Sequence, residues 1–420
     1  MEIFLESEYG LSGDEITEAL KKSLEGKKYR KVLILPPDFT RFHSNAGFIT
    51  NVYYHLLTDE GCEVDVLPAL GTHEPMSEEQ FRKMYGDIPY EKMIPHRWRE
   101  DVETVGEIPA SYMKEITEGL WDEPMKAEIN RRLLDPSYDL ILSVGQVVPH
   151  EVIGMSNHAK NIFVGVGGSE MINKSHMAGA VYGLERMMGK DHTPVRKVFD
   201  YALEHFLSDL PIVFVLTVTT APGGMIQTHG LFIGEKRNVL ERAIALSQKK
   251  NIDFVEHGIQ KCVVYLDPEE FRSTWLGNKA IYRTRMAMAD GGELLILAPG
   301  VQKFGEDEEC DRVIRKYGYC GRLNILRQYR QQEDLKRNMG VAAHLIHGSS
   351  DGRFQVTYAV KRISKGEIES VHYNAADYDE TAERYDPEKL EYGWNRMPDG
   401  EEIFFIPNPA LGLWIDRARF

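Results

Sequence analysis

The chain has 420 residues, enough for two or three domains and for a large core that needs no disulfide or metal support. Hydrophobic residues make up 42% and charged residues 27%, which is typical of an ordered globular protein. The 65 acidic and 50 basic residues leave a net charge of −15, which argues against general binding to nucleic acid or to an anionic membrane.

The four cysteines form no Cys-x-x-Cys pair and are too sparse for a disulfide framework. The first residues lack the basic and apolar regions of a signal peptide. The longest apolar runs, such as residues 211–218, have the length of a strand and are too short to cross a bilayer. We therefore expect a cytoplasmic protein without a membrane segment.

The N-terminal half alternates strand-like and helix-like segments. Strands are expected at residues 31–37, 63–70, 139–145, 161–167 and 211–220. Helices are expected at residues 45–60, from Ser77 onward with Gln80 completing a capping box, and at 169–188, 195–207 and 235–250. Helix-length connections between strands favour a mostly parallel, doubly wound sheet.

A second α/β unit is expected to follow. Its predicted elements are a strand at 262–266, a helix at 278–289, a turn at 290–292, a strand at 293–298, and helices at 307–317 and 323–334. Beyond residue 354 the chain becomes more polar and strand-like, and residues 403–415 are again apolar. These patterns predict two α/β domains, 1–252 and 253–420, with mostly parallel, Rossmann-like sheets and an active-site cleft between them.

Polar residues follow two of the predicted strands at the point where each ends. Asp38, Thr40 and Arg41 follow the first strand, and His73 follows the second. Ligands of open parallel sheets bind beyond the carboxyl ends of the strands. Arg41 could therefore bind an anion, and His73 could act as a general base. The alternatives are an ordinary turn with a solvated arginine and a packed histidine.

The third place is richer in histidine and lysine. His150, His158, Lys160, Lys174 and His176 fall within 27 residues of one another. A metal is conceivable here, but His-Glu-x-x-His, the P-loop and a G-x-G-x-x-G in its usual context are all absent. The residues alone indicate an α/β enzyme of an anionic small molecule with histidine acid/base chemistry, and they leave a bound metal open.

Taken together, the motifs resemble those of the lactate racemase family. The matching residues are Pro37-Asp38-x-Thr40-Arg41, Gly71-Thr72-His73-x-Pro75-Met76, Pro149-His150 with Lys160 ten and His176 twenty-six residues later, and Lys279 eleven residues before Asp290-Gly291-Gly292. The joint pattern spans about residues 36 to 300 and is far more specific than any single piece.

The resemblance implies a nickel-pincer nucleotide as cofactor, a modified pyridinium mononucleotide that holds nickel through two sulfur-bearing arms and a ring carbon. Lys160 would be tethered to it through a thioamide, and His176 would supply the remaining nickel ligand. Asp38 and Thr40 would lie beside the cofactor. Dedicated enzymes build this cofactor, so the resemblance implies them as partners.

The resemblance also implies an isomerase of 2-hydroxy acids. His73 and His150 would be the paired acid/base residues, so that each enantiomer finds a base on its own side while hydride passes from C2 to the cofactor. Arg41 would bind the substrate carboxylate with help from Lys279, and Asp38 and Trp275 would line the substrate site.

One departure from the family pattern bears on the substrate. Lactate racemases have a glutamine three residues before the lysine that matches Lys279, and this chain has Leu276 there, preceded by Trp275. We therefore expect a 2-hydroxy acid larger than lactate, such as the sugar acid gluconate, or malate.

Two other functions remain open, namely a cofactor-binding protein without turnover and a histidine–metal hydrolase of a phosphorylated small molecule. The sequence also leaves open whether His158 lies beside the cofactor site or packs in the core. The same choice applies to His344 and His347, which either pack or face the cleft.

Overall fold

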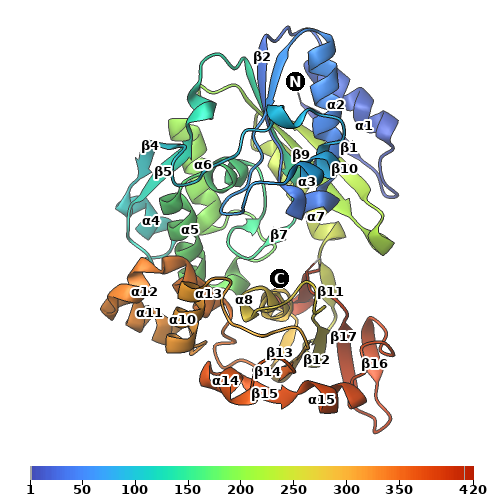
Figure 1. Cartoon of the computed structure of the whole chain (residues 1–420), viewed down its shortest axis with the longest axis vertical. Helices are drawn as coiled ribbons and strands as arrows, with labels where there is room; N and C mark the ends of the chain where they lie inside the picture. The colour runs from blue at the N-terminus through green and yellow to red at the C-terminus, as the bar shows by residue number, and fades with distance from the viewer. Residues whose placement is uncertain (1, 411) are drawn as a thin grey trace. The chain divides into compact units, whose positions relative to one another are not determined.

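The computed structural model describes residues 2–410 and 412–420. The chain forms two compact units (Figure 1). Unit 1 extends to Ser175 and continues from Met187 to Asn251, and unit 2 consists of His176–Arg186 and Ile252–Phe420. The main chain thus passes into unit 2 for one short segment before it returns to unit 1.

Unit 1 is built on a six-stranded sheet. Its strands, in spatial order, are β3 (Glu63–Val66), β2 (Lys31–Leu35), β6 (Leu140–Gln146), β9 (Ile212–Thr220), β10 (Gln227–Gly234) and β1 (Ile3–Glu6). The first four are parallel, and β10 and β1 add an antiparallel edge. The connections between the parallel strands contain the helices that the sequence predicts.

The helices of unit 1 vary in length from two to four turns. They are α1 (Gly13–Leu24), α2 (Ala46–Asp59), α3 (Glu78–Tyr85), α4 (Ala110–Ile116), α6 (Pro194–Phe206) and α7 (Asn238–Lys250), and α5 (Ser169–Tyr182) is divided between the units. Two small antiparallel pairs, β4 (Val102–Ile108) with β5 (Met125–Asn130) and β7 (Pro149–His150) with β8 (Gly154–Met155), complete the unit.

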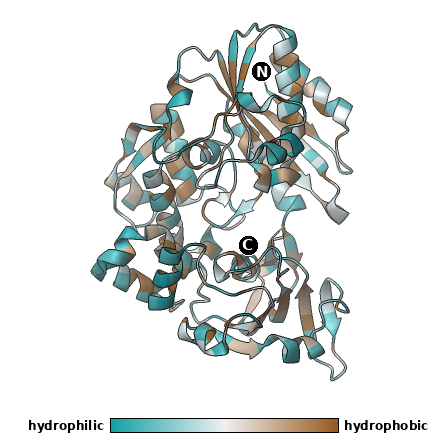
Figure 2. Cartoon of the chain, in the orientation of Figure 1, coloured by the Kyte–Doolittle hydropathy of each residue, from teal (hydrophilic) through white to brown (hydrophobic). Residues whose placement is uncertain are grey.

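Successive side chains of a strand point to opposite faces of the sheet, so the core of unit 1 lies on both faces. Val32 and Ile34 of β2 pack in one cluster with Leu20 of α1 and Tyr53 of α2. Helix α7 contacts β9 and β10. Because both faces are covered, the central strands β2, β6 and β9 are apolar along most of their length (Figure 2).

Unit 2 has a second six-stranded sheet. Its order is β15 (Asn374–Asp377), β14 (Gln355–Val360), β13 (Met288–Ala298), β12 (Ile259–Tyr265), β17 (Glu402–Ile406) and β16 (Gly393–Arg396). All neighbours are parallel except β16, which is an antiparallel edge. A separate parallel pair joins β11 (Asp253–Val255) to β18 (Trp414–Asp416).

The helices of unit 2 are mostly short. They are α8 (Thr274–Gly277), α9 (Lys279–Thr284), α10 (Glu308–Tyr317), α11 (Arg322–Gln331), α12 (Glu333–Arg337), α13 (Met339–His347), α14 (Lys365–Ser370) and α15 (Tyr378–Arg384). The prediction of an α/β fold with mostly parallel sheets is confirmed.

The predicted strand at 161–167 is wrong. Residues Asn161–Gly165 form one turn of π-helix, in which the Val166 N–H donates to the Asn161 carbonyl at 3.0 Å. All five residues are buried, which explains the apolar run, because a short apolar run does not distinguish a buried strand from a buried helical turn. The Asn161 amide also donates to the Leu35 carbonyl and to Ser143 Oγ, both at 3.0 Å, so the turn is attached to β2 and β6.

The predicted helix 278–289 and the turn after it are also corrected. Helix α9 ends at Thr284, and β13 already begins at Met288, so the turn at 290–292 lies inside a strand. The pairing of β12 with β13 is irregular there, and Gly291 has a φ of +78°, which a residue with a side chain rarely adopts. The two glycines form a bulge rather than a chain reversal.

The short segment His176–Arg186 is held to unit 2 by Glu185. The Glu185 carboxylate accepts hydrogen bonds from Arg285 Nε at 2.9 Å and from Arg353 Nη1 at 2.8 Å. Arg285 is almost fully buried, and it also donates to the carbonyls of His347 and Ser349. Two guanidinium groups on one carboxylate explain why this part of the chain belongs to unit 2.

Candidate functional site

Strand pairing brings Asp38 and His73 together. The parallel pairing of β2 with β3 continues beyond the strands to a bridge between Pro37 and Ala69, so the two following loops begin side by side. His73 Nδ1 donates to Asp38 Oδ2 at 2.6 Å. The other carboxylate oxygen accepts from the Thr40 backbone N–H and hydroxyl, at 3.2 and 2.5 Å.

The environment of Asp38 keeps its carboxyl ionised. Asp38 is only 5% exposed, and burial alone would raise its pKa. Hydrogen bonds from His73 and Thr40, together with the charges of His73 and Arg41, outweigh burial and hold the pKa below its usual value. An ionised carboxylate only accepts, so the neutral His73 ring carries its proton on Nδ1 and presents Nε2 as an acceptor.

His150 is held in the opposite tautomer. It lies in the small hairpin of β7 and β8, three residues beyond Val147, which extends the pairing of β6 with β9. The Val152 backbone N–H donates to His150 Nδ1 at 3.1 Å. The neutral His150 ring therefore carries its proton on Nε2. In unit 1, the two candidate histidines are thus held as opposite neutral tautomers.

Lys160 follows a loop in an unusual conformation. Asn157 and His158 both have positive φ, 65° and 58°, although neither is glycine. The fully buried Arg196 donates to the carbonyls of Met155 and Asn157, at 2.6 and 3.2 Å, and so stabilises this backbone. Strain of this kind is concentrated at functional sites. No sequence pattern indicated the role of Arg196.

Lys160 also has an altered pKa. Desolvation and the positive charges of Arg41 and Arg196 lower the pKa of its amine to about 8, while Glu151 and Asp38 oppose the shift. An amine with this pKa is largely neutral slightly above pH 8 and can then act as a nucleophile.

We predict that Lys160 reacts with amine reagents at lower pH than other lysines do. Acylation measured by mass spectrometry should rise with pH through a midpoint near 8, because the neutral amine is the reactive form. The exposed Lys27 and Lys28 serve as internal controls in the same digest. A midpoint for Lys160 equal to theirs would contradict the prediction.

His158 packs in the core. Its ring is 2% exposed and stacks on Phe214, with ring centres 3.8 Å apart. Neither ring nitrogen has a hydrogen-bond partner in the described structure, and burial holds its pKa well below the usual value. Of the two possibilities that the sequence left open, the structure favours packing.

In unit 2, the candidate residues are carried by the elbow of α8 and α9. Trp275 and Leu276 lie in α8, and Lys279 begins α9. Trp275 stacks on the ring of His344, with centres 4.1 Å apart and an angle of 22°. Lys279 Nζ lies 5.8 Å from the centre of the Phe271 ring.

A buried polar network supports this elbow. His344 Nδ1 bonds to the Tyr282 hydroxyl at 2.8 Å, and His344 Nε2 bonds to the Tyr319 hydroxyl at 3.0 Å. Tyr319 in turn bonds to Thr274 Oγ1 at 2.9 Å, at the start of α8. Burial lowers the pKa of His344 to about 3, so the ring is neutral. His344 is therefore a supporting residue behind Trp275.

We predict that Tyr319→Phe lowers the free energy of unfolding by about 1–3 kcal/mol, because it leaves His344 Nε2 and Thr274 Oγ1 buried with one partner fewer. Urea denaturation followed by circular dichroism measures the change. Tyr9→Phe, at a side chain that is 90% exposed, is the control and should change stability by less than about 0.5 kcal/mol. Equal effects of the two variants would contradict a supporting role for Tyr319.

His176 lies in the part of α5 that belongs to unit 2 and is half-buried. Its segment is held to unit 2 by Glu185, as described above. In the described part of the chain, no group of three or more His, Cys, Asp or Glu side chains is arranged to hold a metal ion.

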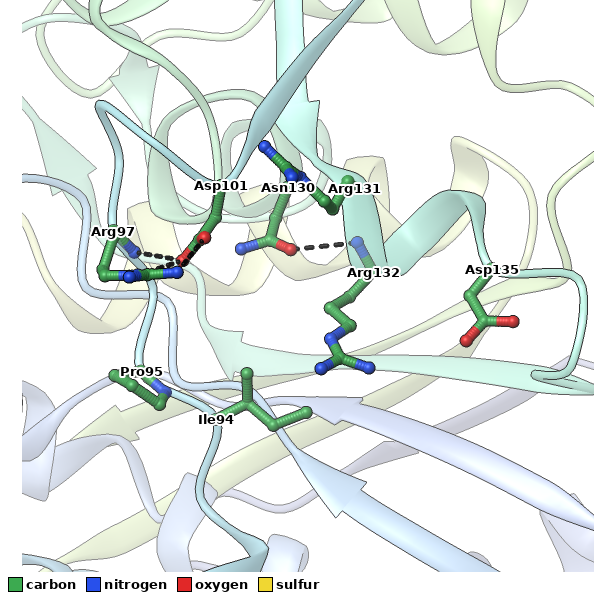
Figure 3. Close-up of a pocket in the computed structure, with 8 residues that line it drawn as sticks. All are labelled: Ile94, Pro95, Arg97, Asp101, Asn130, Arg131, Arg132 and Asp135. Atoms are coloured by element: carbon green, nitrogen blue, oxygen red, sulfur yellow. Dashed lines mark hydrogen bonds and ion pairs between the residues drawn. The ribbon is translucent and has the colours of Figure 1, made fainter.

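A separate pocket of about 630 Å³ in unit 1 contains none of the predicted site residues (Figure 3). Arg97 donates to both oxygens of Asp101, at 2.9 and 2.7 Å. Asn130 accepts from the Arg132 backbone N–H at 3.0 Å. Three arginines and two aspartates line it, and Arg97 is already paired with Asp101.

Comparison with known proteins identifies one domain. Residues 13–187 match the model of the lactate racemase N-terminal domain. The chain thus contains a domain of the lactate racemase family over somewhat less than half of its length. The match covers the loops that carry Asp38, Thr40, Arg41, His73, His150, Lys160 and His176, and it ends before the elbow of Trp275 and Lys279.

Solved structures resemble the chain along almost its whole length. A protein from Thermotoga maritima is 25% identical with a TM-score of 0.79, and the match covers 98% of this chain and 99% of that one. The lactate racemase apoprotein from Thermoanaerobacterium thermosaccharolyticum is 16% identical with a TM-score of 0.71, covering 97% and 93%. No curated protein sequence matches significantly. Among the described residues, no helix has both the length and the hydrophobicity that crossing a bilayer requires.

Proposed function

We propose that the chain is a racemase or epimerase that inverts C2 of a 2-hydroxy acid with a nickel-pincer nucleotide. The observation that carries the proposal is the pair of histidines in the lactate racemase N-terminal domain, held as opposite tautomers by Asp38 and by the Val152 N–H. Inversion requires one group that removes a proton from the substrate hydroxyl and another that returns a proton from the opposite side.

The residues present fit the cofactor. A thioamide tether needs a nucleophilic amine, and the lowered pKa of Lys160 provides one. His176 has an imidazole nitrogen, a suitable nickel donor. Thr40 and Asp38 would lie beside the nucleotide. When bound, this cofactor takes up the hydride of C2 and gives it back.

The remaining steps belong to the side chains of the protein. His73 Nε2 accepts the hydroxyl proton of one enantiomer, and Asp38 stabilises the imidazolium that forms, because its ionised carboxylate lies 2.6 Å from Nδ1. His150 would return a proton to the oxygen when the other enantiomer forms, and it would do so from its imidazolium form, which becomes a neutral ring on losing that proton. For the reverse reaction the two histidines exchange roles.

Arg41 and Lys279 would bind the substrate carboxylate, since both carry a positive charge and Arg41 is exposed at the end of β2. Leu276 replaces the glutamine of lactate racemases, and Trp275 stands next to it, backed by His344. Both features favour a substrate larger than lactate, such as a sugar acid or malate.

The direct test is a screen for inversion of 2-hydroxy acids, resolved by chiral chromatography, with protein co-expressed with the enzymes that build the cofactor. We expect inversion of one acid larger than lactate, with nickel near one per chain. His73→Ala and His150→Ala should each lower turnover at least about a hundredfold while nickel remains bound. His176→Ala should lower the nickel content.

The outcomes separate the alternatives. Bound nickel without inversion of any acid would favour a cofactor-binding protein. Neither nickel nor inversion, with release of phosphate from a phosphorylated small molecule, would favour the hydrolase. Unchanged turnover in either histidine variant would remove that residue from the mechanism.

A second prediction concerns Asp38. Asp38→Asn removes the charge that stabilises the imidazolium, and its amide can donate to Nδ1, so that the ring proton moves to Nε2 and the base is lost. Turnover should fall by about 10²–10⁴-fold with little change in nickel content.

Asp87→Asn is the matched control, because Asp87 is also hydrogen-bonded to a histidine, His55, at 2.9 Å, but on an exposed surface. It should leave turnover unchanged. Full activity of the Asp38→Asn variant would contradict the role of the carboxylate.

A further inference from the structure

Unit 2 has a pocket of its own, and half of the residues that line it carry rings. Its volume is about 550 Å³, and it lies where β11, β16 and β17 present side chains together. Phe254, His257, Tyr392, Trp394 and Phe404 supply the rings. None of the residues proposed above for catalysis or cofactor binding lines it.

The rings support one another and still remain accessible. Trp394 stacks on His257 with centres 5.3 Å apart and packs edge-on against Phe404, also at 5.3 Å. Tyr392 is edge-on to Phe404 at 6.0 Å and accepts a hydrogen bond from the Trp414 indole at 2.8 Å. Even so, Tyr392 is 54% and Trp394 46% exposed. Pre-positioned aromatic rings that remain open to solvent are typical of a ligand site.

One carboxylate in this pocket has no cationic partner. Asp253 accepts from the Tyr392 hydroxyl at 3.2 Å, and no Lys, Arg or His nitrogen lies within 4.0 Å of it in the described residues. Desolvation raises the pKa of Asp253, and the Tyr392 hydroxyl only partly opposes the shift. A cation bound here would therefore meet a carboxylate that no neighbouring Lys, Arg or His already neutralises.

The single arginine of the pocket is already neutralised. Arg417 Nε lies 3.3 Å from Glu256, and its guanidinium lies 4.8 Å from the centre of the Phe254 ring. Asp253, Glu256 and Arg417 together leave a charge of −1 in the pocket. This charge disfavours the binding of an anion, and it favours a cation over a neutral apolar molecule.

We propose that this pocket binds a small organic cation of the alkylammonium class, with its charge beside Asp253 and its alkyl groups against Trp394 and Tyr392. Aromatic faces attract such cations through the ring quadrupole, and Trp is the most effective. The carboxylate adds a Coulombic contribution that a neutral molecule of the same shape cannot use. The site is independent of the proposed isomerase activity.

The test uses the full chain and two probes of the same shape, choline and its neutral carbon analogue 3,3-dimethyl-1-butanol. Titration calorimetry at low salt should show choline binding at least about fivefold more tightly than the alcohol. Trp394→Leu and Asp253→Asn should each weaken choline binding about fivefold or more and bring the two probes closer in affinity. Tyr392→Leu is a second aromatic variant in case Trp394→Leu does not fold.

Asp379→Asn is the control, because this exposed carboxylate of unit 2 pairs with Lys361 and does not line the pocket. It should leave choline binding unchanged. Equal affinity of the two probes, absence of choline binding, or full binding in the Asp253→Asn variant would each overturn the proposal. None of these results depends on cofactor or on turnover, so failure here is distinguishable from failure of the proposed function.

Discussion

Parallel pairing of β2 with β3 on one side and β6 on the other decides where the candidate residues of unit 1 lie. Each of these strands ends at the same edge of the sheet, and the candidate residues lie in the segments that follow. The extension of the pairing to Pro37 and Ala69 brings Asp38 within 2.6 Å of His73. β2 and β6 lie inside the sheet and are paired on both sides, whereas β3 is an edge strand paired with β2.

Buried polar groups then set the chemistry at that edge. Asp38 is ionised in spite of its burial, because three donor or positively charged groups face it, and its charge selects the tautomer of His73. At Lys160, by contrast, desolvation and the charges of two arginines disfavour the charged form of the amine and lower its pKa. Two neighbouring groups of the same unit are thus a stable anion at one position and a partly neutral amine at the other. The difference comes from the neighbours.

Unit 2 uses a polar network for support. Tyr282, His344, Tyr319 and Thr274 form a continuous chain of hydrogen bonds behind Trp275. Glu185 and two arginines attach the segment that contains His176 to this same unit. The proposed metal ligand therefore belongs to a different compact unit from Lys160, although the two residues are only 16 positions apart in sequence. The aromatic pocket of unit 2 around Asp253 contains no residue of either network.

The sequence by itself determined the α/β class, most strands and helices of both units, and the resemblance to the lactate racemase family. Apolar runs and helix-length connections are local signals, and motifs such as Pro37-Asp38-x-Thr40-Arg41 are contiguous. Local signals failed at residues 161–167, where an apolar run is a π-helical turn, and at 290–292, where two glycines form a bulge within β13. In both cases the outcome depends on partners distant in sequence, namely β2 and β6 for the turn and β12 for the bulge.

Only the tertiary structure decided the hydrogen bond between Asp38 and His73, the tautomer of each histidine, the support of Lys160's loop by Arg196 and the aromatic pocket around Asp253. Arg196 lies 36 residues after Lys160, and Tyr392 lies 139 residues after Asp253, so no local pattern connects them. Proton positions and pKa values depend on distances of a few ångströms between such residues, and folding alone sets these distances.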